Sequence, residues 1–209
     1  MQRAREQMVA SQLAARDIDD PRVLSAMGRV PRERFVAPDQ IEYAYDDRPL
    51  PLGAGATISQ PYIVALMSQL ADIQPGVRVL DVGTGSGYQA AVAAELGGVV
   101  FGVEIDAGLA EQARTRLQAL GYAIPIRTGD GHQGWPERGP FDVILVAAAA
   151  ATIPPALVDQ LALGGRMVIP IGQFRRTQIL TVVTRTENGV STRKVTAVAF
   201  VPLVPSRVP

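Results

Sequence analysis

Three alternate glycines that follow a short apolar run are the residues of this sequence best suited to bind a ligand. Val77, Val79, Leu80 and Val82 place apolar side chains on both pleat faces, with Asp81 as a polar exception among them, which is typical of a strand buried in a parallel sheet. Gly83, Gly85 and Gly87 then permit positive φ angles and let a ligand touch the backbone. The helix expected after them points its amides and positive dipole end at this turn. We therefore expect a polar or anionic group to bind there.

The spacing of polar residues at three strand ends indicates which cofactor binds. The dinucleotide fingerprint GxGxxG needs a third glycine, and Tyr88 stands at that position. A second apolar run, 99–103, ends in Glu104, whose carboxylate can accept both hydroxyls of a ribose. A third run, 124–128, leads to Asp130, which could accept from an adenine amino group. Together these features predict S-adenosylmethionine rather than a nicotinamide dinucleotide.

Each feature also has a purely structural explanation. Glycines after a strand often form only a tight βα turn, Glu104 could be a solvated strand end, and Asp130 could form an Asx turn. Their joint occurrence at successive strand ends, where open α/β sheets bind ligands, favours the cofactor site. Asp106 is assigned only as the N-cap of a helix that begins at Ala107.

Composition limits the classes of protein to which this chain can belong. Its 209 residues suit one α/β domain, and 20 basic and 20 acidic side chains give no electrostatic footprint for nucleic acid or an anionic membrane. The chain has no cysteine and one histidine, His132, which excludes disulfides, thiolate chemistry and a multi-histidine metal site. The N-terminus lacks the apolar core of a signal peptide, and residues 49–71 are uncharged but interrupted by proline and glycine. We expect a soluble, cytoplasmic monomer without a metal ion.

The hydrophobic periodicity predicts the elements that position these residues. Helices are predicted over 2–16, 21–30, 61–71, 86–96, 107–120 and 155–161, and parallel strands over 77–82, 99–104, 124–128, 141–146 and 166–171. Runs at 178–185 and 193–201 predict an antiparallel hairpin, and 53–60 a glycine-rich loop. The expected fold is a Rossmann-like class I methyltransferase fold: α/β, doubly wound and mostly parallel, with a C-terminal antiparallel hairpin and an N-terminal helical extension.

Thr57 and Ser59 stand just before the helix expected at Pro61. Serine and threonine are favoured at helix starts because they cap backbone amides. The local pattern therefore leaves two alternatives open for these hydroxyls, a cap and a catalytic group.

Several segments resemble the protein-L-isoaspartate O-methyltransferase family. They are DPRVLSAMGRVPRERFV (20–36), ATISQPYIVA (56–65), VLDVGTGSGYQAA (79–91), GDGHQGWPERGPFDVILV (129–146), IPPALVDQLALGGRMVIPIG (153–172) and FVPLV (200–204). The resemblance covers nearly the whole chain. Its TISQP and FVPL segments are far more specific than the glycine motif, which many methyltransferases share.

This resemblance implies methyl transfer from S-adenosylmethionine to the α-carboxylate of an isoaspartyl residue in a damaged protein, with S-adenosylhomocysteine as product. The ester then cyclises to a succinimide, and hydrolysis returns some normal aspartate. Ser59 is implied as the active-site residue, and His132 as a loop residue without a catalytic role. The implied cofactor contacts are Thr57, Ile58, Asp81, Gly83, Thr84, Gly85, Ser86, Glu104, Ile105, Asp130 and Gly131.

The acceptor chemistry is consistent with so few catalytic groups. A carboxylate with a pKa of about 4 is ionised at neutral pH and needs no general base, so the rate can come mainly from alignment of oxygen, carbon and sulfur. No metal is required.

Two departures from the family pattern bear on substrate preference and rate. Ala56 stands where bacterial members usually have glutamine, and Ala199 where they commonly have arginine.

Alternative functions remain open at this point. One is a carboxyl methyltransferase of the same fold that acts on another peptide or a small acid. Another is a non-catalytic module that binds S-adenosylmethionine and recognises isoaspartyl protein. A nicotinamide oxidoreductase is disfavoured by Tyr88. Within the single domain we expect residues 1–60 to form an extension that closes over the substrate as a lid, and 61–209 to form the cofactor-binding core.

Overall fold

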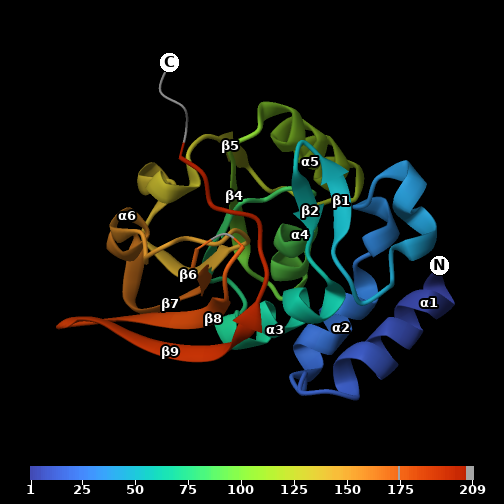
Figure 1. Cartoon of the computed structure of the whole chain (residues 1–209), viewed down its shortest axis with the longest axis horizontal. Helices are drawn as coiled ribbons and strands as arrows, with labels where there is room; N and C mark the ends of the chain where they lie inside the picture. Colours follow the sequence, from blue (N-terminus) through green and yellow to red (C-terminus); the bar gives the residue numbers. More distant parts are fainter. Residues whose placement is uncertain (174, 206–209) are drawn as a thin grey trace.

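The computed structural model describes residues 1–173 and 175–205, and a seven-stranded sheet forms its centre (Figure 1). The strands lie in the order β5-β4-β3-β6-β7-β8-β9. Pairing is parallel from β5 to β7, and β8 is antiparallel to both of its neighbours. The predicted fold class is therefore confirmed. The strands are β3 (Arg78–Val82), β4 (Val99–Glu104), β5 (Ile126–Thr128), β6 (Phe141–Val146), β7 (Leu161–Ile171), β8 (Gln178–Thr186) and β9 (Gly189–Val198).

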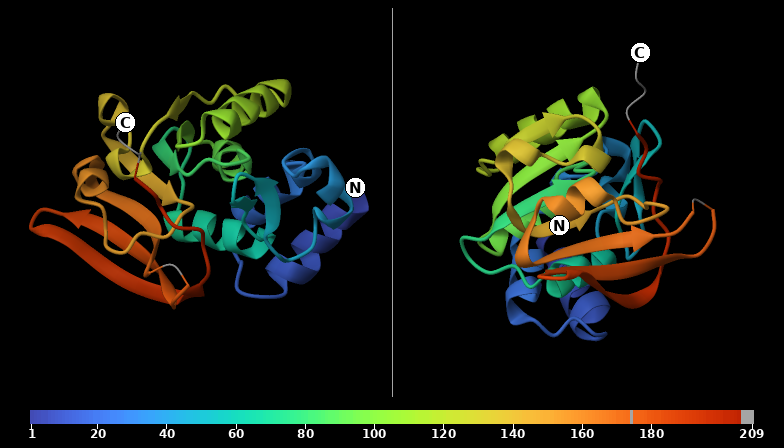
Figure 2. Two further views of the ribbon diagram at one scale, coloured as in Figure 1. Left: turned by 45° about the horizontal axis from the view of Figure 1, so that its top comes forward. Right: turned by 90° about the vertical axis from the view of Figure 1, so that its left-hand side faces the viewer.

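Helices cover the two faces of this sheet unequally. The helices are α1 (Gln2–Gln7), which continues as the π-helix η1 (Met8–Ala14), α2 (Pro21–Arg29), α3 (Pro61–Ala71), α4 (Tyr88–Glu95), α5 (Ala107–Ala119) and α6 (Pro155–Asp159). Short 3-10 turns are η2 (Arg32–Arg34), η3 (Pro38–Tyr43), η4 (Gly131–Gln133) and η5 (Pro136–Arg138). One face packs against α3, α4 and α5, and the other against α6 and the short turns. The N-terminal helices lie beside α3, at the opposite end of the molecule from the tip of the β8–β9 hairpin (Figure 2).

Strand residues alternate between two hydrophobic cores. Val79 and Leu145 belong to the core that contains α3, α4 and α5, whereas Leu80 and Ile144 belong to the core under α6. This period of two places apolar side chains on both faces, as expected for strands that are covered on both sides.

The helix starts are set by carboxylates, though not always by local ones. Asp20 accepts from the Arg22 amide at 2.8 Å and is the N-cap of α2. Asp106 accepts from the Leu109 amide at 2.8 Å, which confirms the predicted N-cap of α5. The N-cap of α3 is Gln60, whose side chain makes no capping bond. Asp47 supplies an acceptor instead, because its carboxylate receives the Tyr62 amide at 3.1 Å. Neither Thr57 nor Ser59 caps this helix.

The glycine-rich stretch before α3 was predicted as a loop, and this was wrong. It is an antiparallel hairpin of β1 (Leu50–Gly53) and β2 (Ala56–Ile58). The turn residues Ala54 and Gly55 have φ values of 51° and 74°, the left-handed geometry that suits a tight hairpin turn.

The sheet differs from the prediction at several strand and helix ends. The strand β7 begins at Leu161 instead of residue 166, because Gly164 and Gly165 lie inside the strand at an irregularity in its pairing with β6. A Cβ at Gly165 would lie 3.0 Å from the Asp142 carbonyl oxygen, so this strand needs glycine there. The strand β8 ends at Thr186, one residue later than expected, and β9 ends at Val198, three residues earlier. Among the described residues, we find no helix with the length and apolar character needed for a membrane span.

Candidate active site

The carboxyl ends of β3, β4 and β6 meet where the strand order reverses. β3 lies between β4 and β6, so the chain after β3 passes to one side and the chain after β6 to the other. The Gly83 amide donates to the Val103 carbonyl oxygen at 2.8 Å, and the Ala147 amide donates to that of Val82 at 2.8 Å. Such a switch point opens a crevice in which open α/β sheets bind ligands.

The glycine turn after β3 has the backbone geometry that its sequence predicts. Gly83, Gly85 and Gly87 have φ values of 77°, 52° and 89°, a region that disfavours other residues. At Gly87 a Cβ would also lie 3.0 Å from the Leu117 side chain. Tyr88, in place of a third glycine, is buried and packs its ring edge against Phe35 at 5.5 Å.

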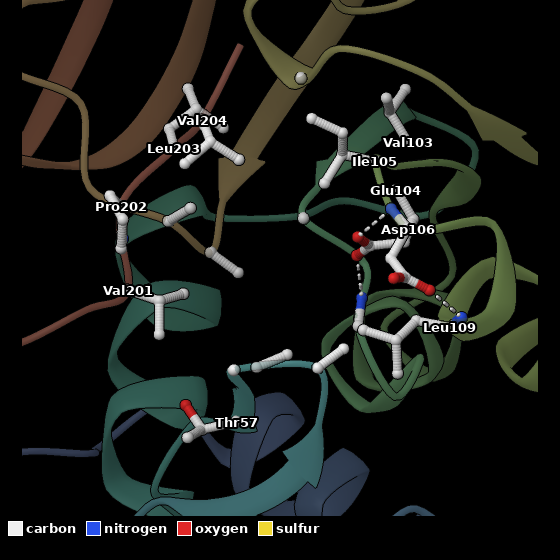
Figure 3. Close-up of a pocket in the computed structure, with 18 residues that line it drawn as sticks. Thr57, Val103, Glu104, Ile105, Asp106, Leu109, Val201, Pro202, Leu203 and Val204 are labelled. Atoms are coloured by element: carbon white, nitrogen blue, oxygen red, sulfur yellow. Dashed lines mark hydrogen bonds between the residues drawn. The ribbon is translucent and has the colours of Figure 1, made fainter. Parts of the chain in front are cut away.

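A cavity of about 250 Å³ lies over this turn, and we call it the cofactor cavity (Figure 3). The predicted contacts Thr57, Gly83, Gly85, Glu104, Ile105 and Gly131 line it. Its other walls come from the hairpin turn 54–56, from Asp106 and Leu109 at the start of α5, from Ala147 and Ala148, and from residues 201–204. That terminal segment is held over the site because Ala149 donates to the Val201 carbonyl oxygen and accepts from the Leu203 amide, both at 2.8 Å.

Glu104 is held at the wall of the cofactor cavity by two backbone amides (Figure 3). One carboxylate oxygen accepts from Gly85 at 2.8 Å and the other accepts from Asp106 at 3.0 Å. The side chain is 6% exposed. Because each carboxylate oxygen can accept more than one hydrogen bond, Glu104 can still receive the hydroxyls of a bound ribose.

Asp81 lies on the neighbouring strand β3, and its surroundings are the opposite of those of Glu104. Its carboxylate is completely buried, and neither oxygen has a hydrogen-bond partner among the described residues. Burial raises the pKa of Asp81 to about 7; the Thr84 side chain opposes this shift and the nearby Glu104 charge adds to it. The Thr84 hydroxyl donates to the backbone carbonyl of Asp81, at 3.1 Å. A buried carboxylate of this kind is suited to a cationic ligand group, since an unpaired buried charge is costly.

The loop after β5 brings its backbone, rather than its acidic side chain, to the cofactor cavity. Gly131 lines the cavity, and a Cβ there would lie 2.7 Å from Val82. Asp130 accepts from the amide of His132 at 2.8 Å and lies 2.9 Å from its ring nitrogen Nδ1. His132, expected in a loop, lies in the short turn η4. The contact of Asp130 with adenine stays a prediction.

Two further cavities continue from the cofactor cavity. A narrow one of about 30 Å³ is lined by Thr57, Ile58, Ser59, Val64, Gly83, Thr84, Gly85, Ser86, Tyr88, Gln89 and Ala147. A larger one of about 600 Å³, which we call the acceptor cavity, is lined by Pro49, Thr57, Ser59, Gln60, Ile63, Ala147, Arg176, Thr177 and residues 197–201. Thr57 and Ala147 line all three cavities, so these cavities meet at one point.

Ser59 lies at this meeting point. It lines the narrow cavity and the acceptor cavity but not the cofactor cavity. The residue is half-buried, and its hydroxyl makes no hydrogen bond to any other described residue. It is therefore available to a ligand.

Ser86, which lines the narrow cavity, also makes local hydrogen bonds that support the glycine turn. Its hydroxyl accepts from the Tyr88 amide at 3.3 Å and supports the start of α4. Its backbone carbonyl accepts from Arg116 at 2.8 Å. Ser86 can thus shape the glycine turn from within.

Comparison with known proteins identifies the family. The sequence model of the family named Protein-L-isoaspartate(D-aspartate) O-methyltransferase, PCMT, matches residues 3–208. The chain belongs to this family. A protein-L-isoaspartate O-methyltransferase from Gloeobacter violaceus is 52% identical over 197 residues, which are 94% of this chain and 96% of that protein. A second PCMT relative, protein-L-isoaspartate O-methyltransferase 2 of a Polaromonas species, is 56% identical over 90% of each chain.

A solved PCMT structure shares the whole architecture. The Plasmodium falciparum protein, described as a beta-aspartate methyltransferase in complex with S-adenosyl-L-homocysteine, superposes with a TM-score of 0.83. It is 30% identical in sequence, and the match covers 96% of this chain and 98% of that one.

The site prediction omitted several residues of the cofactor cavity, among them the segment 201–204, the hairpin turn 54–56 and Asp106. The FVPLV segment at 200–204 was recognised as distinctive, and this distinctiveness could have marked it as part of the site. The hairpin turn 54–56 carried no such indication, because its place at the cavity wall depends on tertiary packing. Asp106 was assigned only as a helix cap, yet it also lines the cofactor cavity.

Proposed function

We infer that this protein is an S-adenosylmethionine-dependent methyltransferase that esterifies the α-carboxylate of isoaspartyl residues in damaged proteins. Membership of the PCMT family and relatives of this name at about half identity carry the reaction class. The observation that supports the proposed residue roles is that Thr57 and Ala147 line the cofactor, narrow and acceptor cavities, and that Ser59 lines the narrow and acceptor cavities.

The residues around the cofactor cavity fit S-adenosylmethionine. Glu104, which lines the cavity, would accept the ribose hydroxyls. Asp81 does not itself line the cavity, but its buried, unpartnered carboxylate would attract the ammonium group of the methionine part. Gly83 and Gly85 allow a close approach of the ligand to the backbone. When bound, the cofactor supplies an electrophilic methyl group on a sulfonium. Thr57, Ile58, Thr84, Ser86, Ile105, Asp130 and Gly131 complete the proposed cofactor contacts.

Ser59 would orient the acceptor. Its free hydroxyl can donate to one oxygen of the isoaspartyl carboxylate, which leaves the other oxygen to attack the methyl carbon. The carboxylate is ionised at neutral pH, so no proton has to be removed. Attack on a sulfonium neutralises charge, and exclusion of water from the narrow cavity would favour that step. Alignment of the two reactants then supplies most of the rate.

The proposed function also includes an oligomeric state, a cellular location and separate roles for the two parts of the chain. We propose that the protein acts as a monomer on isoaspartyl proteins and peptides, without a nucleic-acid or membrane partner, in the cytoplasm. Residues 1–60 would cover the substrate and 61–209 would bind the cofactor. The hairpin turn at 54–56 lines the cofactor cavity and Thr57 lines both larger cavities, which supports a covering role for the end of that extension.

Closure of the region 40–60 can be tested by limited proteolysis. Addition of S-adenosylhomocysteine should slow cleavage in this region several-fold, because a closed hairpin opens locally less often. Cleavage in the β8–β9 turn, far from the cavities, is the internal control. Unchanged cleavage of 40–60 in the cofactor complex would contradict a moving lid.

The proposed activity is tested with labelled S-adenosylmethionine and a short isoaspartyl peptide, with the aspartyl isomer as control. Base-labile label should form only in the isoaspartyl peptide. Ser59→Ala should lower kcat by roughly 10- to 100-fold, the loss expected for one hydrogen bond to a charged group, with unchanged affinity for S-adenosylhomocysteine. Ser191→Ala, at an exposed serine of β9, is the matched control. Cofactor binding without label in either peptide would contradict the proposal.

A further inference from the structure

The acceptor cavity carries one charged side chain. Arg176 lines it, and every other described residue in its wall is uncharged. The walls otherwise consist of apolar side chains, hydroxyls and the amide of Gln60. A single cation in a cavity with low-dielectric walls gives that cavity a positive potential.

Arg176 is not engaged by the protein itself. Its exposed side chain makes no hydrogen bond or ion pair with another described residue. Many other arginines of the described chain are paired with carboxylates, namely Arg16, Arg22, Arg29, Arg48, Arg114, Arg127 and Arg166. The guanidinium of Arg176 is therefore available to a ligand that enters the acceptor cavity.

The backbone that carries Arg176 leads into a strand end that is hydrogen-bonded to another lining segment of the cavity. Arg176 follows β7 in the turn that leads into β8, two residues before Gln178. The buried Gln178 side chain accepts from the Phe200 amide at 2.6 Å and donates to the Phe200 carbonyl at 3.1 Å. This pair of bonds fixes the turn against the segment 197–201, so Arg176 has a defined place at the cavity wall.

The carboxylate nearest in sequence to this wall is already neutralised. Asp47 accepts from Gln60 at 3.1 Å, from the Tyr62 amide at 3.1 Å, and from Arg16 at 3.0 Å. Asp47 is thus engaged by donors of its own surroundings and forms no ion pair with Arg176.

We propose that Arg176 selects isoaspartyl substrates that carry an acidic residue beside the isoaspartyl site. The inference rests on the proposed function, because it assigns the acceptor cavity to the substrate peptide. An aspartate or glutamate side chain next to the acceptor would pair with the guanidinium at the cavity wall. The pair would form on binding and persist during methyl transfer, so it would lower KM without a change in kcat. Arg176 is thus a specificity-determining residue.

The test uses isoaspartyl peptides that are identical except for glutamate or glutamine at the neighbouring positions. Wild-type protein should methylate the glutamate peptide with a kcat/KM about two- to fivefold higher, the range for a partly exposed ion pair. The preference should reside in KM and should shrink at high ionic strength, because salt screens exposed charges.

Three variants separate this role from a general electrostatic effect. Arg176→Gln should remove the preference, so that the glutamate and glutamine peptides are methylated with equal kcat/KM. Arg176→Glu should reverse it, so that a peptide with neighbouring lysine becomes the better substrate. Arg175→Gln removes the same charge one residue away, outside the described cavity wall, and should keep the wild-type preference.

Several outcomes would overturn the inference. Equal kcat/KM for both peptides in the wild type would do so, as would loss of the preference in Arg175→Gln. An equal fall in kcat for all peptides in Arg176→Gln would show that the arginine acts on the acceptor carboxylate itself. Methylation of the glutamine peptide shows independently that the proposed function holds; if neither peptide is methylated, both the function and this inference fail.

Discussion

Asp81 and Glu104 stand at the carboxyl ends of neighbouring strands and yet have opposite surroundings. Glu104 receives two backbone amides, from Gly85 and Asp106, and lines the cofactor cavity. Asp81 is completely buried without a partner among the described residues. Glu104 therefore organises the loops of the site even without a ligand, whereas Asp81 has a partner only in the proposed complex, where the ligand brings a cation.

The largest effect that would separate the two carboxylates is on stability. Burial raises the folded-state pKa of Asp81 to about 7, above the 3.8 of a fully hydrated aspartate. The folded protein therefore holds this proton between those pH values, and stability falls as pH rises from about 4 to 7 and stays low above that. A shift of about three pH units corresponds to at most about 4 kcal/mol. Asp81→Asn should raise the unfolding free energy at pH 8 by up to that amount.

Urea unfolding at several pH values checks this prediction. The advantage of Asp81→Asn should shrink as pH falls from 8 to 4, because the wild-type carboxyl is then protonated. A variant less stable than the wild type at pH 8 would show that Asp81 is paired in the free protein, and the contrast with Glu104 would disappear.

A substitution of Glu104, on the neighbouring strand, should change the unfolding free energy in the opposite direction. Glu104→Gln can no longer accept from both Gly85 and Asp106, so one of these amides loses its partner. The unfolding free energy should fall by about 1–3 kcal/mol, and the affinity for S-adenosylhomocysteine should fall roughly 100-fold because the ribose acceptor is also weakened. Calorimetric unfolding and isothermal titration measure both quantities. Gln118→Glu, a conservative exchange on α5 outside the cavities, is a suitable control. Unchanged stability would mean that the two amide bonds do not organise the loop.

A smaller effect is expected on the pH dependence of cofactor binding. If the ligand ammonium pairs with ionised Asp81, binding below pH 7 must release the proton that burial holds on this group. The affinity for S-adenosylhomocysteine should then fall by up to about tenfold per pH unit between 7 and 5, and Asp81→Asn should abolish this slope. Calorimetric binding titrations in buffers with different ionisation enthalpies measure how many protons are released when the ligand binds. A slope that persists in the variant would assign it to another group.

Local sequence determined the cofactor half of the site to a large extent. Gly83, Gly85 and Gly87 need positive φ angles, and Asp20 and Asp106 cap helices within three residues of themselves. These effects act over short stretches of chain, so composition and spacing are enough to predict them. Family resemblance added Ser59 and the FVPLV segment, which periodicity does not explain.

Tertiary structure decided what the local pattern left open. The cap of α3 comes from Asp47, and this distant acceptor leaves the Ser59 hydroxyl free. The hairpin of 50–58 reaches the cofactor cavity because it lies against the glycine turn, where a Cβ at Gly85 would be 3.6 Å from the Leu52 side chain. Asp81 lost its hydration, and Arg176 gained its place beside Phe200, through contacts between residues far apart in the sequence. Burial and long-range partners depend on the whole fold, whereas turns and caps depend on a few neighbouring residues. For this reason the sequence predicted the turns and the local caps but did not predict the burial and the long-range partners.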